Sequence, residues 1–434
     1  MTQLVKVVNK LFIYLLLLLK YRLLEVCPLM TSDLVIIGGG ASGFMGAITA
    51  ITNGVRSVVI LEGTSKVLEK VRISGGGRCN LTNSCFEISN LVNNYPRGEK
   101  QLLGLFNRFS TTEAFDWFQK KGLSLKVEND GRVFPCSDSS EEVIRCLTSV
   151  AKNSGVKVLT NSHVKKISMI NGGFNLLVKG NNSFKAKNIL ICSGGHPSGR
   201  RLAKSLGHSI IQPVPSLFSF ATADSLLRDC SGINLDVQIK LNVNNKKYSG
   251  EGPILITHKG FSGPVILRIS AFSARKLYEN KYNAELRINW LCMNENEARL
   301  KIDLYKLENG KKLIFNNKPF HNLPRSLWKS FLLSLNVDTQ LKWAELSKSD
   351  KESLIKCLTM KTYLIKGRGP FGEEFVTAGG VSLKEINFKT MESKICKGVF
   401  FAGEVLDIDG VTGGFNFQHC WTSGWVAGKS IVHS

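Results

Sequence analysis

The sequence predicts an α/β fold in which a parallel sheet is interrupted by an inserted antiparallel sheet or barrel. A complete run of strand, glycine turn, helix and second strand occupies residues 33–63. After residue 216 the pattern changes to alternating stretches such as "VQIKLNV". A buried strand near residue 400 then leads through another glycine-rich turn into a helix, which returns the chain to the first domain. The 434 residues and 43% hydrophobic content suit a packed protein of two or three domains.

The first glycine turn follows the strand at residues 34–37 and has the spacing G-x-G-x-x-G. Gly38 permits the tight turn, Gly40 lets a phosphate approach the backbone, and Gly43 lets the helix pack on the sheet. Free amides at the helix start favour a pyrophosphate. The residues expected to frame it are Gly38, Gly40, Ala41, Ser42 and Gly43. Glu62 ends the second strand, nineteen residues after Gly43, where it is placed to accept hydrogen bonds from a ribose. A bound dinucleotide is therefore predicted.

The stretch "SGGGRCNLTN" at residues 74–83 is a second candidate contact. Its glycines, Gly76 and Gly77 among them, let the main chain run against a flat or anionic ligand. Arg78 is suited to neutralise a phosphate, and Asn80 adds a polar group. Cys79 has no partner cysteine or evident base, so we expect it to be packed.

The middle of the chain predicts a capped helix at residues 139–155 and then four short strands that form a meander. The last strand opens into Ser193, Gly194 and Gly195, which would bring backbone close to the same dinucleotide. His196 and Pro197 are expected to interrupt a helix start there. We therefore predict one dinucleotide domain and no dedicated NAD(P) domain.

The inserted region reads as an antiparallel sheet or barrel with the amphipathic helices "LPRSLWKSFLLSL" and "DKESLIKCL". His258 lies in a glycine-flanked loop and is a weak catalytic candidate, because a lone histidine beside a turn is more often solvated or structurally bonded.

The turn at residues 403–416 sets three carboxylates among glycines. FAD offers ribityl hydroxyls that donate to a carboxylate such as Glu404, and a flavin edge that becomes anionic on reduction and accepts from helix-start amides. The residues expected to supply these contacts are Gly403, Glu404, Gly413, Gly414, Phe415 and Asn416. For Asp407 and Asp409 we favour bonds to neighbouring loops.

The composition limits which cellular compartment, metal sites and binding partners are expected. Eleven cysteines without a C-x-x-C pair argue against a disulfide framework and a structural zinc, so no metal is expected and a cytoplasmic setting fits best. The net charge of +23 favours phosphorylated ligands, nucleic acid or anionic membranes, but its scatter fits coding bias equally well.

Residues 1–30 contain the apolar run "LFIYLLLLL", which is too short to span a bilayer. They are either a mis-assigned start before Met30 or a membrane-touching extension.

Four stretches together resemble a bacterial flavoprotein family described as aminoacetone-oxidase-like, or BaiN-like after a bile-acid reductase. They are "DLVIIGGGASGFMGA", "ISGGGRCNLTN", "VTAGGVSLKEINFKTMESK" and "FFAGEVLDIDGVTGGFN". The resemblance implies an FAD-binding domain (residues 31–213 and 372–434), a β-barrel domain (214–294 and 358–371) and a helical subdomain (295–357). It also implies that Val164 holds adenine through its backbone. The "QHC" segment at residues 418–420 departs from the family pattern.

The sequence thus predicts an FAD-dependent oxidoreductase that exchanges a hydride with a small organic substrate. The reaction is either reduction of a C=C bond with NAD(P)H as a transient donor or oxidation of an amine by oxygen. The alternative is an RNA-associated flavoprotein, similar to tRNA-modifying enzymes, that uses its basic surface. A third hypothesis is a membrane-anchored sensor in which residues 1–29 hold the protein to a membrane.

Overall fold

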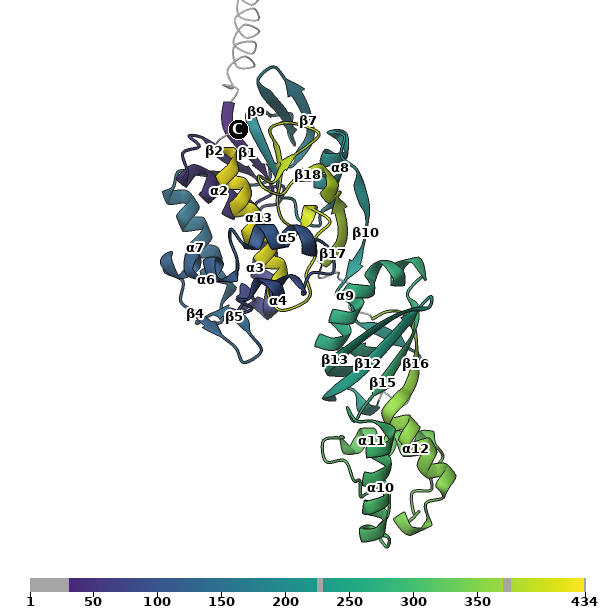
Figure 1. Cartoon of the computed structure of the whole chain (residues 1–434). Coiled ribbons are helices and arrows are strands. Elements are labelled where there is room, and N and C mark those ends of the chain that lie inside the picture. Colours follow the sequence, from purple (N-terminus) through teal and green to yellow (C-terminus); the bar gives the residue numbers. More distant parts are fainter. Residues whose placement is uncertain (1–30, 225–228, 370–375, 433–434) are drawn as a thin grey trace, which may run out of the picture.

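The computed structural model describes residues 31–224, 229–369 and 376–432, and Figure 1 shows three parts arranged in a row. A large α/β domain contains both ends of the described chain, a barrel follows it, and a group of helices occupies the far end. This arrangement confirms the predicted fold class. The predicted extension at residues 1–30 lies outside the described residues. No helix in the described ranges is long and apolar enough to cross a membrane.

A nine-stranded sheet whose middle strands are parallel forms the centre of the α/β domain. Strand β1 (Thr31–Ile37) lies between β2 (Val58–Leu61) and β9 (Ser183–Ile191) and is parallel to both. Leu34, Val35 and Ile36 are fully buried, as expected for a strand covered on both faces. Strand β20 (Val399–Phe401) pairs in parallel with β9, so the carboxy-terminal segment completes a sheet begun near residue 31. The outer strands of the sheet are β6 (Lys157–Leu159), β18 (Ile386–Asn387) and β19 (Glu392–Ser393).

Helices α2 (Ala41–Thr52) and α13 (Phe415–Ile431) pack along each other on this sheet (Figure 1). Their contact depends on small residues. A Cβ on Gly424 would lie 2.5 Å from the Ser42 carbonyl oxygen, and one on Gly428 would lie 2.5 Å from that of Gly46. The close approach places the middle of α13 beside the start of α2, so segments from opposite ends of the chain meet in the domain.

The remaining elements of the α/β domain surround the sheet. The helices are α3 (Glu69–Ile73), α4 (Ile88–Val92), α5 (Glu99–Phe106), α6 (Thr111–Lys120), α7 (Ser140–Asn153) and α8 (Pro197–Ser205). The strands are β3 (Thr82–Asn83), β4 (Leu125–Val127), β5 (Arg132–Pro135), β7 (Val164–Ile170), β8 (Gly173–Val178), β10 (Ile210–Ser216) and β17 (Val376–Val381). Strands β7, β8 and β9 form an antiparallel meander, whereas the first of the four strands predicted for it, β6, instead pairs in parallel with β2.

The first residues of helices α7 and α8 can be compared with what the sequence predicted for them. Helix α7 confirms the helix predicted at residues 139–155, although the side chain of its N-cap residue, Ser139, makes no capping hydrogen bond. The expectation that His196 and Pro197 interrupt a helix was wrong. His196 is the N-cap of α8 and its side chain accepts from the Ser198 amide, while Pro197 occupies the first turn, where a missing N–H costs nothing.

The inserted region forms a closed six-stranded barrel. Its strands, in chain order, are β11 (Phe220–Thr222), β12 (Asn234–Val243), β13 (Lys246–Thr257), β14 (Gly260–Ser262), β15 (Asn283–Asn289) and β16 (Lys361–Arg368). Alternate side chains of β12, at Val237, Ile239, Leu241 and Val243, are buried in its interior. The period-two pattern that predicted an antiparallel sheet therefore gives the barrel its core.

Helices connect the barrel to its two neighbours. Helix α9 (Pro264–Glu279) contacts β12, β13 and β14 of the barrel, and also β10 and β17 of the α/β domain. At the far end lie α10 (Glu295–Asn309), α11 (Arg325–Ser334) and α12 (Lys348–Met360), which include both predicted amphipathic helices. Trp328 and Trp343 are almost fully buried there and stack with ring centroids 6.2 Å apart.

Candidate functional site

The first glycine turn joins β1 to α2, and packing of its own backbone fixes its shape. Gly38 has a φ of +112°, and a Cβ on Gly43 would lie 2.1 Å from the Gly38 carbonyl oxygen. A side chain at either position would strain this turn. At Gly40, by contrast, no described atom lies within 4 Å of the position that a Cβ would take. The amide start of α2 therefore faces open space, as a pyrophosphate would require. Ala41 and Ser42 begin α2 and are buried.

Glu62 lies at the carboxyl end of the second strand, beside this turn. Its Oε2 accepts from the Gly39 amide at 2.8 Å, and its Oε1 accepts from the Thr64 amide at 2.8 Å. The carboxylate is thereby fixed next to the glycine turn, where a dinucleotide ribose would lie. Val164, the predicted adenine contact, begins β7 and is buried, and the adjacent His163 ring contacts His196.

The loop at residues 74–80 presents uncovered backbone. Gly76 and Gly77 have φ values of +69° and +88°, and no described atom would lie within 4 Å of a Cβ on either residue. Cys79 is fully buried and burial raises its pKa to about 12, which confirms that it is packed. With its amide oriented to satisfy both groups, Asn80 donates to Thr82 and accepts from the Gly414 amide at 3.0 Å. This loop therefore touches the second glycine turn.

The charge of Arg78 is already balanced in this structure. Its guanidinium pairs with Glu128 and with Asp138, and lies 3.9 Å from the centre of the Phe134 ring. The hydrogen bond that Arg78 donates to Glu128 contributes most to raising the pKa of the guanidinium. Neutralisation of a phosphate by Arg78 stays a prediction.

The residues that follow β9 lie beside the second glycine turn. A Cβ on Gly195 would lie 3.0 Å from the Glu404 carboxylate, so the two predicted contacts are neighbours. Gly194 has a φ of +58°. The Ser193 hydroxyl is buried and has no hydrogen-bond partner among the described residues.

The second glycine turn begins with the short helix η5 (Gly403–Val405). Glu404 Oε1 accepts from the Thr377 amide at 3.0 Å, and Oε2 pairs with Lys70 Nζ at 2.7 Å. Gly403 has a φ of +76°, and a Cβ there would lie 2.5 Å from Ser42 Oγ at the start of α2. The first and second turns are thus in contact.

The turn ends at the start of α13. Gly414 is the N-cap residue with a φ of +92°, and a Cβ there would lie 2.3 Å from the Thr82 carbonyl oxygen. Asn416 Oδ1 accepts from the Gly410 amide at 2.8 Å, and its Nδ2 donates to the Gly410 carbonyl at 2.9 Å. The side chain of Asn416 therefore closes the turn, which leaves backbone amides of Gly413 and Phe415 as the groups suited to a flavin edge.

The other two acids of the turn hold it to the barrel, which confirms the structural role favoured from the sequence. Asp409 is fully buried and pairs with Arg97, whose Nη1 also donates to the Ala271 carbonyl of α9 at 2.7 Å. Asp407 pairs with Arg275 of α9, and burial raises the pKa of this carboxyl.

The "QHC" segment lies in α13 behind the second turn. Gln418 accepts from the Thr82 hydroxyl and donates to that of Thr422. His419 is 2% exposed, neither ring nitrogen has a partner among the described residues, and burial lowers its pKa to about 4. Burial raises the pKa of Cys420 to about 12. Sequence reasoning flagged this segment only as a departure from the family pattern.

His258 lies outside the candidate FAD site, in the barrel. It is exposed in the turn between β13 and β14, where the Lys259 carbonyl accepts from the Thr222 amide at 3.0 Å. The nearby Asp224 pairs with Lys361, the residue at which β16 leaves the helical group. This is the end of the barrel that adjoins α12. A catalytic role for His258 stays a prediction.

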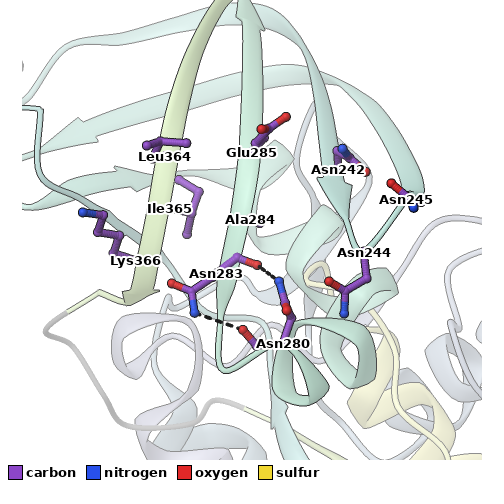
Figure 2. Close-up of a pocket in the computed structure, with 10 residues that line it drawn as sticks. All are labelled: Asn242, Asn244, Asn245, Asn280, Asn283, Ala284, Glu285, Leu364, Ile365 and Lys366. Carbon is purple, nitrogen blue, oxygen red and sulfur yellow. Dashed lines mark hydrogen bonds between the residues drawn. The ribbon is translucent and has the colours of Figure 1, made fainter.

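A pocket of about 330 Å³ lies at the opposite end of the barrel, where the strand ends are rich in asparagine (Figure 2). Asn280 and Asn283, in the turn after α9, exchange side-chain-to-carbonyl hydrogen bonds of 2.7 and 3.1 Å. The remaining asparagines around it are Asn242, Asn244 and Asn245. None of the predicted cofactor residues lines this pocket.

The residues present fit a bound FAD. Gly40 leaves an open cradle at one helix start, and Glu62 is fixed beside it, where a ribose would be expected. Gly414 is the N-cap of the second helix, and Gly403, the neighbour of Glu404, packs against the start of the first. Sequence reasoning missed Lys70, Thr377 and Arg97, because each acts through a partner distant in the chain.

The family model described as "HI0933-like protein Rossmann domain" matches residues 32–430. The chain is 28% identical over 409 residues to a 3-dehydro-bile acid delta(4,6)-reductase of Clostridium scindens, covering 92% of this chain and 98% of that protein. It is 28% identical to a ribosomal RNA dihydrouridine synthase of Haemophilus influenzae and 27% identical to one of Escherichia coli, with the same coverage of both chains.

Proposed function

The chain belongs to the HI0933-like family of FAD-dependent oxidoreductases, and from that premise we propose that it reduces a carbon–carbon double bond conjugated with a carbonyl group. One observation carries the proposal. The relatives are named for unlike molecules, a 3-dehydro-bile acid and uridine in ribosomal RNA, yet both names describe saturation of a ring double bond. In a 3-oxo-4,6-diene and in uracil alike, that double bond is conjugated with a carbonyl group. The shared chemistry, rather than either substrate, is what we transfer to this chain.

The residues of the chain would bind and orient the cofactor for this reaction. FAD, when bound and reduced, would supply the hydride, and a proton taken from solvent would complete saturation of the double bond. The amide start of α2 at Gly40 would hold its pyrophosphate, and Glu404 would accept hydroxyl groups of the ribityl chain. The backbone amides at Gly413 and Phe415 would stabilise negative charge on the flavin edge. Arg97 and Arg275 keep α9 of the barrel against this turn, where it would limit access of water.

The first test is an anaerobic visible spectrum of the purified protein before and after addition of NADPH. We expect flavin bands that bleach with NADPH and return when a conjugated enone is added without oxygen. A saturated ketone is the matched control and should leave the flavin reduced. Bands that persist with NADPH but bleach with an amine would overturn the proposal in favour of amine oxidation.

A second candidate substrate is a uracil base within RNA. The specific observation in its favour is the net charge of +23, since a polyanionic substrate is attracted by a strongly basic protein. The reaction is the same one, applied to the double bond of the uracil ring.

A further inference from the structure

The positive charge of the chain is concentrated in one segment. Residues 143–223 contain 11 Lys and Arg and no Asp or Glu, whereas residues 31–142 contain 12 of each kind. The acid-free segment therefore carries 11 of the 23 net positive charges. The excess looks scattered along the sequence because its cations are separated by apolar strand residues.

The fold gathers several of these cations on the β7–β8–β9 meander. Ser168, Asn175 and Lys185 lie opposite one another across the three strands, and Lys166 is two residues from Ser168 on the same face. The opposite face carries Ile167, Leu176 and Phe184, which pack toward the core. Apart from the half-buried Leu177, which lies opposite Lys166, this face of the meander is polar and basic.

A bulge extends this basic face. The register of β7 against β8 shifts between Val164 and Lys166, which leaves Lys165 as an extra residue, and both lysines are exposed. Lys179 is exposed at the end of β8. We call Lys165, Lys166, Lys179 and Lys185 the meander lysines.

The meander lysines are not neutralised within the described ranges. The neighbouring Lys187 pairs with Asp33 at 2.7 Å, but no described carboxylate forms an ion pair with any of the four. Like charges held together without acids repel one another and attract a polyanion.

We propose that the meander lysines form a docking surface for the phosphodiester backbone of RNA, an inference that rests on the RNA candidate named under the proposed function. The outward positions at Lys166, Ser168, Asn175 and Lys185 carry no aromatic ring on which a base could stack. The surface is therefore suited to phosphates, which position a nucleic acid, and not to base readout.

The position of the meander lysines sets a minimum length for an RNA that could contact them and the flavin at the same time. Lys165 directly follows Val164, so the meander lysines border the adenine end of the candidate FAD site, at the end of the α/β domain away from the barrel (Figure 1). The reacting base must reach the flavin end near Glu404. A long RNA can occupy both places at once, whereas a mononucleotide reaches only the flavin.

The test measures binding of a fluorescent uridine-rich 30-nucleotide RNA to the FAD-loaded protein at several salt concentrations. The variant replaces Lys165, Lys166 and Lys185 with Gln. The matched control replaces Lys301, Lys311 and Lys312, exposed lysines of the helical group, and so removes the same charge. We expect the meander variant to lower the salt slope of log K by about 2 and to weaken binding about tenfold or more at physiological salt. The control should bind like the wild type, and reaction with uridine monophosphate should be unchanged in both variants.

Three results would overturn the docking surface: equal loss in both variants, no loss in either, or binding of the wild type to phosphatidylserine vesicles but not to RNA. Flavin absorbance and bleaching by NADPH check that each variant is folded. If RNA binding behaves as expected but no uracil is reduced in any RNA, the RNA candidate for the reaction fails while the docking surface stands.

Discussion

The two glycine-rich turns of the candidate FAD site differ in what holds them. The first, at residues 38–43, is shaped by contacts within one strand–turn–helix unit, such as that between Gly43 and the Gly38 carbonyl. The second, at residues 403–416, is held by side chains from distant segments. Arg97 reaches Asp409 from 312 residues away, and Arg275 reaches Asp407 from 132 residues away.

A glycine-rich turn can thus be held in shape either by contacts within its own segment or by side chains that the folded chain brings to it from distant segments. A locally specified turn should fail through a small change of its own backbone. A turn specified by the fold should fail when one distant partner is lost, and its failure should loosen the barrel as well, because both distant arginines contact α9 or belong to it.

The largest effect is expected at the second turn from Asp409→Asn. Asp409 is fully buried, and its loss would leave the Arg97 guanidinium, whose side chain is only 10% exposed, without its carboxylate. Removing one partner of a buried ion pair costs about 3–5 kcal/mol. Urea unfolding of the FAD-free protein should show this loss. The control is Glu279→Gln, which breaks the exposed, solvent-screened pair with Lys276 and should leave stability almost unchanged. Equal, small losses in the two variants would mean that the second turn does not depend on Arg97.

The next effect is expected at the first turn from Gly43→Ala. The new Cβ would lie 2.1 Å from a backbone oxygen that cannot move aside cheaply, so we expect a loss at the upper end of about 1–3 kcal/mol together with loss of FAD. Gly40→Ala is the matched control. No described atom obstructs its Cβ, so the protein should keep its stability but hold FAD less tightly. The measurements are unfolding midpoint and flavin absorbance after purification. Normal FAD retention by Gly40→Ala would show that the dinucleotide does not pass over this residue.

The same difference explains what the sequence could predict. The first turn, the helix at α7 and the alternation of β12 were readable because glycine spacing, capping and period-two burial are local. The two carboxylates that pair with Arg78 lie 50 and 60 residues away, so sequence reasoning offered Arg78 to a phosphate without seeing them.

The second turn was predicted in part for the same reason. Its acids and glycines were recognised, and a structural role was favoured for Asp407 and Asp409, but Arg97 and Lys70 carry no motif that marks them as partners. Likewise, His196 and Pro197 were taken as helix breakers, although the same two residues form a capped helix start once the chain has turned.

The smallest effect concerns His419, behind the second turn, and it depends on pH. The folded pKa of about 4 lies below the ordinary value of 6.5, because burial disfavours the charged ring. The unfolded chain therefore binds a proton that the folded protein excludes. The stabilisation is fully present above pH 6.5 and is lost as the pH falls toward 4, by about 2 kcal/mol between pH 8 and pH 5. Replacing His419 with Leu should remove this part of the pH dependence, so that the stability of the variant rises relative to that of the wild type as the pH falls.

His258→Leu, which changes an exposed ring in the barrel, is the control and should follow the wild type. Parallel pH profiles for the wild type and His419→Leu would show that the ring is not held neutral. The expected divergence would show that the helix start behind the second turn tolerates an unpaired imidazole only in its neutral form.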